Sequence, residues 1–367
     1  MTGARPSAAQ RRSTTRRETR ERWAEEISAR AEAYWTAERI HGQLGDKDLM
    51  LPPNEAAPLL RALGLIKADA SMSPSGVRKY MQINHMVKLL ESVFVALARR
   101  APVVRVLDAG CGSSHLTLLL AWCFEHRWRR SARILGVDRN AQIIERCRER
   151  AEMALLDDLL RYEASTIDEL DLPAVWADAF DEKSPEPLVH ALVALHACDT
   201  ATDDALALAI DVGAELIAAA PCCQAELARR WAELDNADAS GPFEPIWGAP
   251  HLRREVAATM TDALRTLLLR GCGYAVTPME FVPSTHTPKN TLLRAVRVGG
   301  SAPEHFERYV VLREALGGAD IALARSISAD HRRALEEAER RCASPQGPYF
   351  SVATKVPDQG SGGGVSA

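Results

Sequence analysis

The order of apolar segments between Val103 and Val298 restricts the fold more than any other feature of this sequence. In this range short β-like apolar runs alternate with longer segments of helical periodicity. Such alternation is typical of a parallel sheet wrapped by helices, because parallel strands need long crossover connections. The predicted strands span residues 103–109, 133–137, 161–166, 188–197, 215–221, 274–282 and 291–298.

The last two predicted strands, 274–282 and 291–298, are joined by only eight residues. That connection is too short for a helical crossover, so these strands should form an antiparallel hairpin. Strands 188–197 and 215–221 are near-continuous apolar runs, as strands covered on both faces should be. The sequence therefore predicts an α/β fold with a seven-stranded, mostly parallel sheet and a terminal antiparallel hairpin.

The length of the chain predicts additions to this sheet. Its 367 residues exceed the ~250–300 at which one hydrophobic core usually stops growing. Helical patterns run from Trp23 to Ile66 and from Val77 to Arg100, so an N-terminal helical region should precede the sheet. The predicted divisions are 1–22, a basic flexible arm; 23–100, a helical cap; 103–298, the sheet domain; 299–356, a C-terminal helical extension; and 357–367, a disordered tail rich in Gly and Ser.

Charge and hydropathy exclude several classes of protein. The 45 Lys and Arg nearly balance the 49 Asp and Glu, which argues against a surface that is basic throughout. A local basic patch remains open, because seven arginines lie among the first 22 residues, at 5, 11, 12, 16, 17, 20 and 22. No apolar run reaches the ~18 residues that would cross a bilayer, and no signal peptide begins the sequence, so we expect a cytoplasmic protein without a membrane partner. The eight cysteines should then be free or metal-bound.

The strongest motif joins the first predicted strand to the helix after it. The strand ends in Asp108, and the turn that follows contains Gly110 and Gly112. Glycines let the backbone approach a ligand closely, and the free N–H groups of a helix start favour a carboxylate or phosphate. Asp138 ends the second strand, where a carboxylate can accept both ribose hydroxyls of a nucleoside. Together these features predict a site for a nucleoside cofactor.

The spacing distinguishes between cofactors. A nicotinamide cofactor favours Gly-x-Gly-x-x-Gly with a ribose carboxylate about 20 residues on. Here the third glycine is absent, and Asp138 lies 28 residues after Gly110. The motif Asp108-x-Gly110-x-Gly112, the Gly-x-Asp138 of the second strand and the terminal hairpin resemble the class I S-adenosylmethionine-dependent methyltransferases over residues 103–298.

This resemblance implies a Rossmann-like fold and S-adenosyl-L-methionine as cofactor. In that family the residue matched by Asp108 and the glycine loop, with Gly110, Gly112 and Ser114, cradles the methionine part of the cofactor. The residue matched by Asp138 holds the ribose.

A second group of polar residues follows the fourth and fifth predicted strands. His196, Cys198 and Asp199 end the fourth strand, and Cys222-Cys223 follows the fifth. Both strand ends border the ligand crevice of such a sheet, so these side chains can converge there. The pattern is similar to a subgroup that includes the eukaryotic tRNA 2′-O-methyltransferases of the acceptor stem, although Asp199 replaces a glycine.

Three roles for this group remain open. Its cysteines could serve packing alone, because free Cys is among the most buried residue types. His196, Cys198, Cys222 and Cys223 have the ligand types of a zinc site, although adjacent cysteines are poorly spaced for one. A nucleophilic thiolate assisted by His196 is the third reading.

Two further segments are predicted to border the crevice. Lys79 and Gln82 lie on the helix just before the sheet and offer hydrogen-bond donors. The polar loop of the terminal hairpin contributes His286, Lys289 and Asn290 as candidates for holding the acceptor.

The reaction we predict is in-line transfer of a methyl group, which mostly requires positioning of the acceptor lone pair. Asp199 or His196, with Cys198 beside them, could orient the acceptor or take its proton. The arginine-rich arm and the subgroup resemblance favour RNA, either tRNA or rRNA, as the acceptor. A small molecule or a protein side chain is the first alternative, and an inactive nucleoside- or RNA-binding module is the second.

Overall fold

The computed structural model describes residues 8–183, 185–195, 197, 199–221, 224–237, 239, 241–280 and 291–344, with side chains from residue 15 onward. Its chain divides into two compact units, which we describe separately. Unit 1 comprises residues up to Cys223 together with Thr277–Arg297, and unit 2 comprises Gln224–Val276 and the residues from Val298 onward.

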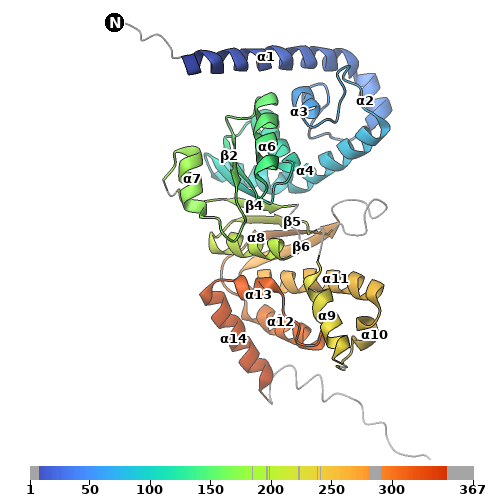
Figure 1. Cartoon of the computed structure of the whole chain (residues 1–367), viewed down its shortest axis with the longest axis vertical. Coiled ribbons are helices and arrows are strands. Elements are labelled where there is room, and N and C mark those ends of the chain that lie inside the picture. Colours follow the sequence, from blue (N-terminus) through green and yellow to red (C-terminus); the bar gives the residue numbers. More distant parts are fainter. Residues whose placement is uncertain are drawn as a thin grey trace, which may run out of the picture. The chain divides into compact units, whose positions relative to one another are not determined.

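The sheet has seven strands in the order β3-β2-β1-β4-β5-β7-β6. Figure 1 labels β2, β4, β5 and β6 among them. The strands are β1 (Val104–Ala109), β2 (Ala132–Asp138), β3 (Leu160–Ala164), β4 (Ala191–Ala194), β5 (Leu216–Ala219), β6 (Tyr274–Glu280) and β7 (Thr291–Arg297). The pairs β1–β2, β2–β3, β1–β4 and β4–β5 are parallel, whereas β5–β7 is antiparallel. The predicted mostly parallel sheet with antiparallel end strands is confirmed. Its strand order reverses between β1 and β4, the position at which such sheets form a ligand crevice.

Helices connect these strands. In unit 1 they are α5 (His115–Trp122), the π-helix η1 (Cys123–Arg127), α6 (Ala141–Met153), α7 (Leu172–Phe180) and α8 (Thr200–Asp211). The helix predicted after the first strand thus ends in a π turn. The fourth strand is also shorter than the predicted 188–197, because the chain leaves the sheet after Ala194 and enters a turn at Asp199. Hydropathy does not distinguish strand residues from the apolar residues that flank them.

Four helices precede the sheet: α1 (Ala8–Tyr34), α2 (Ala37–Leu44), α3 (Ala57–Ala62) and α4 (Pro74–Arg100). Helix α4 is capped by Ser73, whose hydroxyl accepts the N–H of Gly76 at 3.0 Å. It then buries residues at spacings of three and four, among them Tyr80, Ile83 and Val87. These residues belong to the same continuous core as the sheet, so the helical region and the sheet stabilise each other.

Helix α1 starts within the stretch predicted as an arm. Its Arg17 pairs with Asp158 at 3.3 Å, and its Arg20 pairs with Glu152 on α6. Ion pairs between residues this far apart in sequence are not visible in a charge pattern. The described helix begins at Ala8, earlier than the predicted helical region at Trp23.

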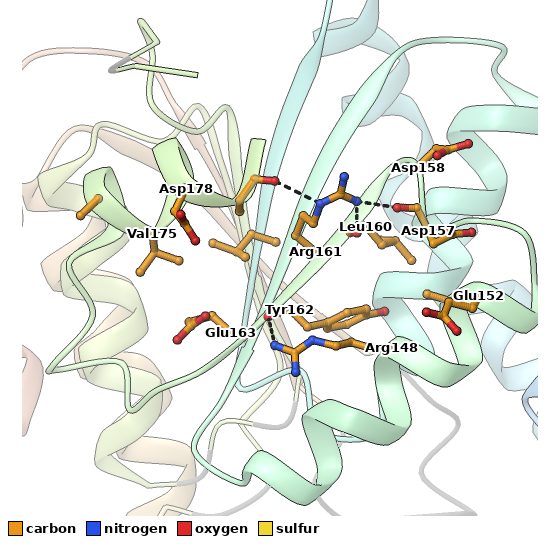
Figure 2. Close-up of a pocket in the computed structure, with 14 residues that line it drawn as sticks. Arg148, Glu152, Asp157, Asp158, Leu160, Arg161, Tyr162, Glu163, Val175 and Asp178 are labelled. Carbon is orange, nitrogen blue, oxygen red and sulfur yellow. Dashed lines mark hydrogen bonds between the residues drawn. The ribbon is translucent and has the colours of Figure 1, made fainter. Parts of the chain in front are cut away.

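Strand β3 forms one edge of the sheet, and arginines cover its outward-facing carbonyls. Arg148 donates to the carbonyl of Tyr162 at 2.7 Å, and Arg161 donates to the carbonyl of Leu160 at 2.8 Å (Figure 2). Arg161 also donates to the carbonyl of Ala179 at the end of α7, at 3.1 Å. Occupied carbonyls make an edge strand a poor template for pairing with another chain.

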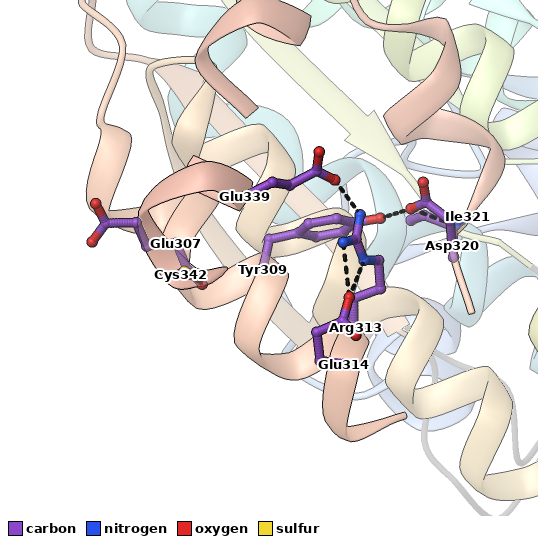
Figure 3. Close-up of polar contacts among 8 residues, drawn as sticks. All are labelled: Glu307, Tyr309, Arg313, Glu314, Asp320, Ile321, Glu339 and Cys342. Carbon is purple, nitrogen blue, oxygen red and sulfur yellow. Dashed lines mark hydrogen bonds and ion pairs between the residues drawn. The ribbon is translucent and has the colours of Figure 1, made fainter. Parts of the chain in front are cut away.

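Unit 2 contains α9 (Glu226–Asn236), α10 (Glu244–Trp247), α11 (Pro250–Gly271), α12 (Pro303–Ala315), α13 (Ala322–Ser326) and α14 (Ala329–Ala343). Arg313 on α12 forms ion pairs with Glu339 on α14 at 2.5 Å and with Glu314 at 2.8 Å (Figure 3). The buried hydroxyl of Tyr309 donates to Asp320, and burial raises the pKa of Tyr309 well above its usual value. These contacts hold α12 against α14 and the turn at Asp320. None of the described helices is long and apolar enough to cross a membrane.

Candidate functional site

The glycine loop between β1 and α5 makes two positive-φ turns at glycine, at Gly110 (φ 73°) and Gly112 (φ 51°). The N–H groups of Gly110 and Cys111 both donate to the carbonyl of Val137, each at 2.9 Å, which ties the loop to the end of β2. A Cβ atom at Gly110 would lie 3.2 Å from the backbone N of Ala197, just beyond β4. Glycine is therefore required here both for its backbone conformation and for its small size.

Asp138 closes this loop from the end of β2. Its Oδ2 accepts the N–H of Gly112 at 3.0 Å, and its Oδ1 accepts the N–H of Asn140 at 2.9 Å. Each carboxylate oxygen has lone pairs for a further hydrogen bond. The carboxylate is thus held by backbone donors and can still accept hydroxyl groups, which fits a ribose.

Asp108 lies beneath the loop and is only 2% exposed. Its Oδ2 accepts a hydrogen bond from the hydroxyl of Thr117 on α5 at 2.6 Å. Burial raises the pKa of Asp108 to about 7; the bond from Thr117 opposes this shift, and the nearby charge of Asp138 adds to it. A nearby cation stabilises the ionised form of such a buried carboxyl. Asp108 therefore fits S-adenosyl-L-methionine, which carries a sulfonium and an ammonium group.

Ser114, which is predicted to contact the cofactor, also contacts another strand of the sheet through its side chain. It is fully buried in the left-handed conformation (φ 62°), and its hydroxyl lies 2.5 Å from that of Tyr162 on β3. Its side chain is therefore committed to the interior, and it supports the loop from below. Arg150 on α6 also supports the loop, by donating to the carbonyl of Ser113 at 2.7 Å.

The predicted acceptor residues on α4 lie near the start of α5. Lys79 is exposed, and its Nζ is 3.3 Å from Nε2 of His115, whose Nδ1 is 2.8 Å from the hydroxyl of Ser113. Lys79 is thus linked through His115 to the glycine loop. Gln82 is partly buried on the next turn of α4.

Asp199 occupies the turn between β4 and α8 with φ 53° and ψ −121°. Non-glycine residues rarely adopt this conformation, which costs of order 1–3 kcal/mol and persists where the surrounding structure imposes it. The hydroxyl of Thr202 donates to the carbonyl of Ala197 at 2.8 Å and fixes the turn. Because Ala197 abuts Gly110, this strained turn lies beside the glycine loop.

Several predicted site residues lie outside the described residues: His196, Cys198, Cys222, Cys223, His286, Lys289 and Asn290. Within the described part of the chain, no group of three or more His, Cys, Asp or Glu could hold a metal ion.

A cavity of about 710 Å³ lies along β3, between α6 and α7 (Figure 2). It contains Tyr162, which contacts Ser114 of the loop, but none of the predicted site residues. Its charged lining is mostly acidic, with Arg148 and Arg161 set against Glu152, Asp157, Asp158, Glu163 and Asp178. The local charge therefore disfavours a phosphate ligand in this cavity.

Sequence reasoning missed four residues that shape the site: Thr117, Asn140, Arg150 and Tyr162. Asn140 had a signal, because an Asn just before a helical pattern is a preferred N-cap, and its side chain accepts the N–H of Gln142 at 3.0 Å. The other three act through contacts between separate elements, and nothing in their local sequence marks them.

Comparisons with known proteins agree with this geometry. Residues 78–230 match a family model described as a methyltransferase domain. No curated protein matches the sequence at a significant level.

Similar solved structures include the methyltransferase domain of METTL16 (12% identity, covering 68% of this chain and 81% of that chain, TM-score 0.37). Two others are Aeropyrum pernix fibrillarin with natively bound S-adenosyl-L-methionine (12% identity, 56% and 74% covered, TM-score 0.32) and geranyl diphosphate C-methyltransferase from Streptomyces coelicolor A3(2) (16% identity, 62% and 88% covered, TM-score 0.31). These TM-scores are low, so the assignment depends on the family match and on the geometry above. Residues 78–230 thus match a methyltransferase domain, and the sheet order and the glycine loop with its two carboxylates fit a class I fold that binds S-adenosylmethionine.

Proposed function

We propose that this methyltransferase acts on RNA and that Asp199 positions the acceptor or takes its proton. The strained backbone at Asp199, two residues beyond the Ala197 that abuts Gly110, is the observation that carries the catalytic assignment. An enforced conformation next to a cofactor loop is typical of a functional residue.

The chain's own residues divide the work in this proposal. Asp108 and the glycine loop hold the methionine part of the cofactor, and Asp138 holds the ribose. S-adenosylmethionine supplies an electrophilic methyl group when bound. Asp199 is partly exposed and can face a ligand, and the neighbouring His196 and Cys198 belong to the same proposed catalytic group. Lys79, Gln82, His286, Lys289 and Asn290 are proposed to hold the acceptor.

The arginine-rich N-terminal region supports RNA as the acceptor. Arg16 and Arg22 on α1 are exposed to solvent. Arginines in this position can neutralise phosphates and release counterions, which makes binding depend on salt. The acidic lining of the cavity along β3 directs phosphates away from that edge.

Incubation with radiolabelled S-adenosylmethionine and fractionated cell extract tests the acceptor class. We expect label in the RNA fraction and none with the Asp138→Ala variant, which loses a ribose contact. Label in protein or small molecules, with none in RNA, would overturn the RNA assignment and leave the methyltransferase assignment intact.

A small-molecule or protein acceptor is the second candidate, and the ion pairs of α1 favour it. Arg17 and Arg20 are bonded to Asp158 and Glu152, so α1 could act as a cover of the domain instead of an RNA-binding arm. Deletion of residues 1–22 discriminates between the two. An RNA-binding arm predicts weaker RNA binding with a flatter salt dependence, whereas a cover predicts a changed KM for the acceptor and no change in salt slope.

A further inference from the structure

Two cysteine thiols meet beneath the glycine loop. Cys111 lies in the loop between Gly110 and Gly112, and Cys147 lies on α6. Both thiols point at one acceptor, the carbonyl of Gly112, with Sγ–O distances of 3.8 Å for Cys111 and 3.2 Å for Cys147. Both residues are almost fully buried, at 1% and 0% exposure. Two thiols that share one backbone acceptor are neighbours even though they come from different elements.

The two thiols differ chemically. The pKa of Cys147 is lowered, chiefly by its side-chain contact with Cys111, and the charge of Arg150 adds to this effect. The same contact and burial raise the pKa of Cys111. Cys147 is therefore the better nucleophile of the pair, and Cys111 holds the proton.

We propose that Cys111 and Cys147 form a reversible disulfide that weakens cofactor binding, with a hydroperoxide as the oxidant. The Cys147 thiolate attacks a peroxide oxygen and becomes a sulfenic acid, and hydroxide leaves and takes up a proton. The thiol of Cys111 then attacks the sulfenic sulfur, which forms the S–S bond and releases water. The two thiols lose two electrons, and hydrogen peroxide gains them as it is reduced to two molecules of water.

The position of Gly112 connects this bond to the cofactor site. Gly112 accepts from both thiols through its carbonyl and donates through its N–H to Asp138 at 3.0 Å. A disulfide requires the two sulfurs to approach to about 2.05 Å and removes both S–H donors from that carbonyl. A Cβ at Gly136 would lie only 3.2 Å from the sulfur of Cys111, so β2 leaves this sulfur little room on that side. When the two sulfurs approach, the glycine loop should therefore shift, and the hydrogen bond from the N–H of Gly112 to Asp138 should weaken.

Bound cofactor should in turn affect the formation of the disulfide. If the disulfide weakens cofactor binding by some factor, the bound cofactor must disfavour the disulfide by the same factor. Because both thiols are buried, the oxidant should reach them when the loop opens, and a bound cofactor should keep the loop closed. Cys123 and Cys342 are poorer reactants, since burial raises the pKa of Cys123 to about 12 and also raises that of Cys342.

The experiment treats the reduced full-length protein with hydrogen peroxide and identifies the linked cysteines by mass spectrometry of unreduced peptides. Calorimetry with S-adenosylhomocysteine measures affinity before oxidation, after it, and after dithiothreitol. We expect a Cys111–Cys147 link, at least about five-fold weaker binding and full recovery on reduction. Saturating S-adenosylhomocysteine should slow the formation of the link.

Two variants complete the design. Cys342→Ser keeps the pair and should behave as the unchanged protein does. Cys147→Ser should keep its own reduced affinity after peroxide, and its melting temperature shows whether it folds. A link between other cysteines, persistence of both thiols, or a Cys111–Cys147 link without loss of affinity would each overturn the proposal. The inference rests on cofactor binding and not on the acceptor, so evidence against RNA as the acceptor would leave it intact. A reduced protein that does not bind the cofactor would instead contradict the cofactor assignment.

Discussion

Asp108 is buried, and its carboxyl group titrates differently from that of an aspartate in water. Its pKa in the folded protein is about 7, against 3.8 as the usual value, because it is buried. Between these two pH values the unfolded chain is ionised at this position while the folded protein holds a proton. Asp108 should therefore favour folding at low pH, and that contribution should be lost as the pH rises through 7.

This titration predicts the pH dependence of cofactor binding. A cationic ligand prefers the ionised carboxylate, so binding of S-adenosylmethionine should tighten as the pH rises through about 7. Asp108→Asn should bind more weakly and lose this dependence. Calorimetry from pH 5.5 to 8.5 measures both effects, with Asp178→Asn, an exposed carboxyl on α7, as the control. An Asp108→Asn variant with the pH profile of the unchanged protein would contradict this role.

The backbone strain at Asp199 gives a second prediction at the residue scale. Asp199→Gly relieves the unfavourable φ of 53° and should stabilise the protein by about 1 kcal/mol. The same change removes the carboxylate, so methyl transfer should fall by about 10²-fold or more while cofactor binding is retained. Thermal unfolding and single-turnover transfer measure the two quantities.

Asp181→Gly is the matched control, because Asp181 also has a positive φ of 52° but ends α7 away from the glycine loop. It should change stability in the same direction and leave transfer unaffected. A fully active Asp199→Gly enzyme would show that the turn serves the fold and not the reaction.

Site features that depend on neighbouring residues in the sequence could be predicted, whereas contacts between separate elements could not. The turns at Gly110 and Gly112 and the position of Asp138 at a strand end could be inferred, because they follow from local backbone chemistry. The orientation of Ser114 could not be inferred, because it depends on Tyr162, which is 48 residues away on another strand. Cys147 was equally invisible, since it reaches the loop only through the packing of α6.

At the scale of elements, the periodicity of apolar residues was sufficient to predict the strands of the sheet. It was insufficient to predict where some helices begin and end. The alternation of strand and helix patterns predicted seven strands and the antiparallel end. It did not predict the π turn at 123–127, because the apolar spacing there is compatible with an α-helix. The ion pairs of α1 were not predicted either, since their partners Asp158 and Glu152 are more than 130 residues away in the sequence.

Helix α1 offers a prediction that belongs to this scale. Reversing the charges of Arg17 and Arg20 to Glu should loosen α1 from α6 and from the turn before β3, because both ion pairs become repulsive. Amide exchange in α1 should then become faster, and the combined change with Glu152→Arg should restore part of the protection. High salt should weaken the contact in the unchanged protein, because partly exposed pairs are screened. Unaltered exchange in α1 would show that apolar packing alone holds the helix.

At the scale of the whole molecule, the proposed cofactor residues all lie in unit 1, and this placement predicts where a ligand stabilises the protein. S-adenosylhomocysteine at one hundred times its Kd should stabilise the binding-competent state by about 2.7 kcal/mol. Amides that exchange only when unit 1 opens should then exchange roughly 100-fold more slowly. Amides of α12 and α14 in unit 2 should be unaffected if the two units open independently. Hydrogen exchange with mass spectrometry separates these peptides, and Asp138→Ala should show no ligand effect in either unit. Equal protection in both units would mean that the chain opens as one cooperative structure, so a perturbation of the network around Tyr309 and Arg313 would then weaken cofactor binding as well.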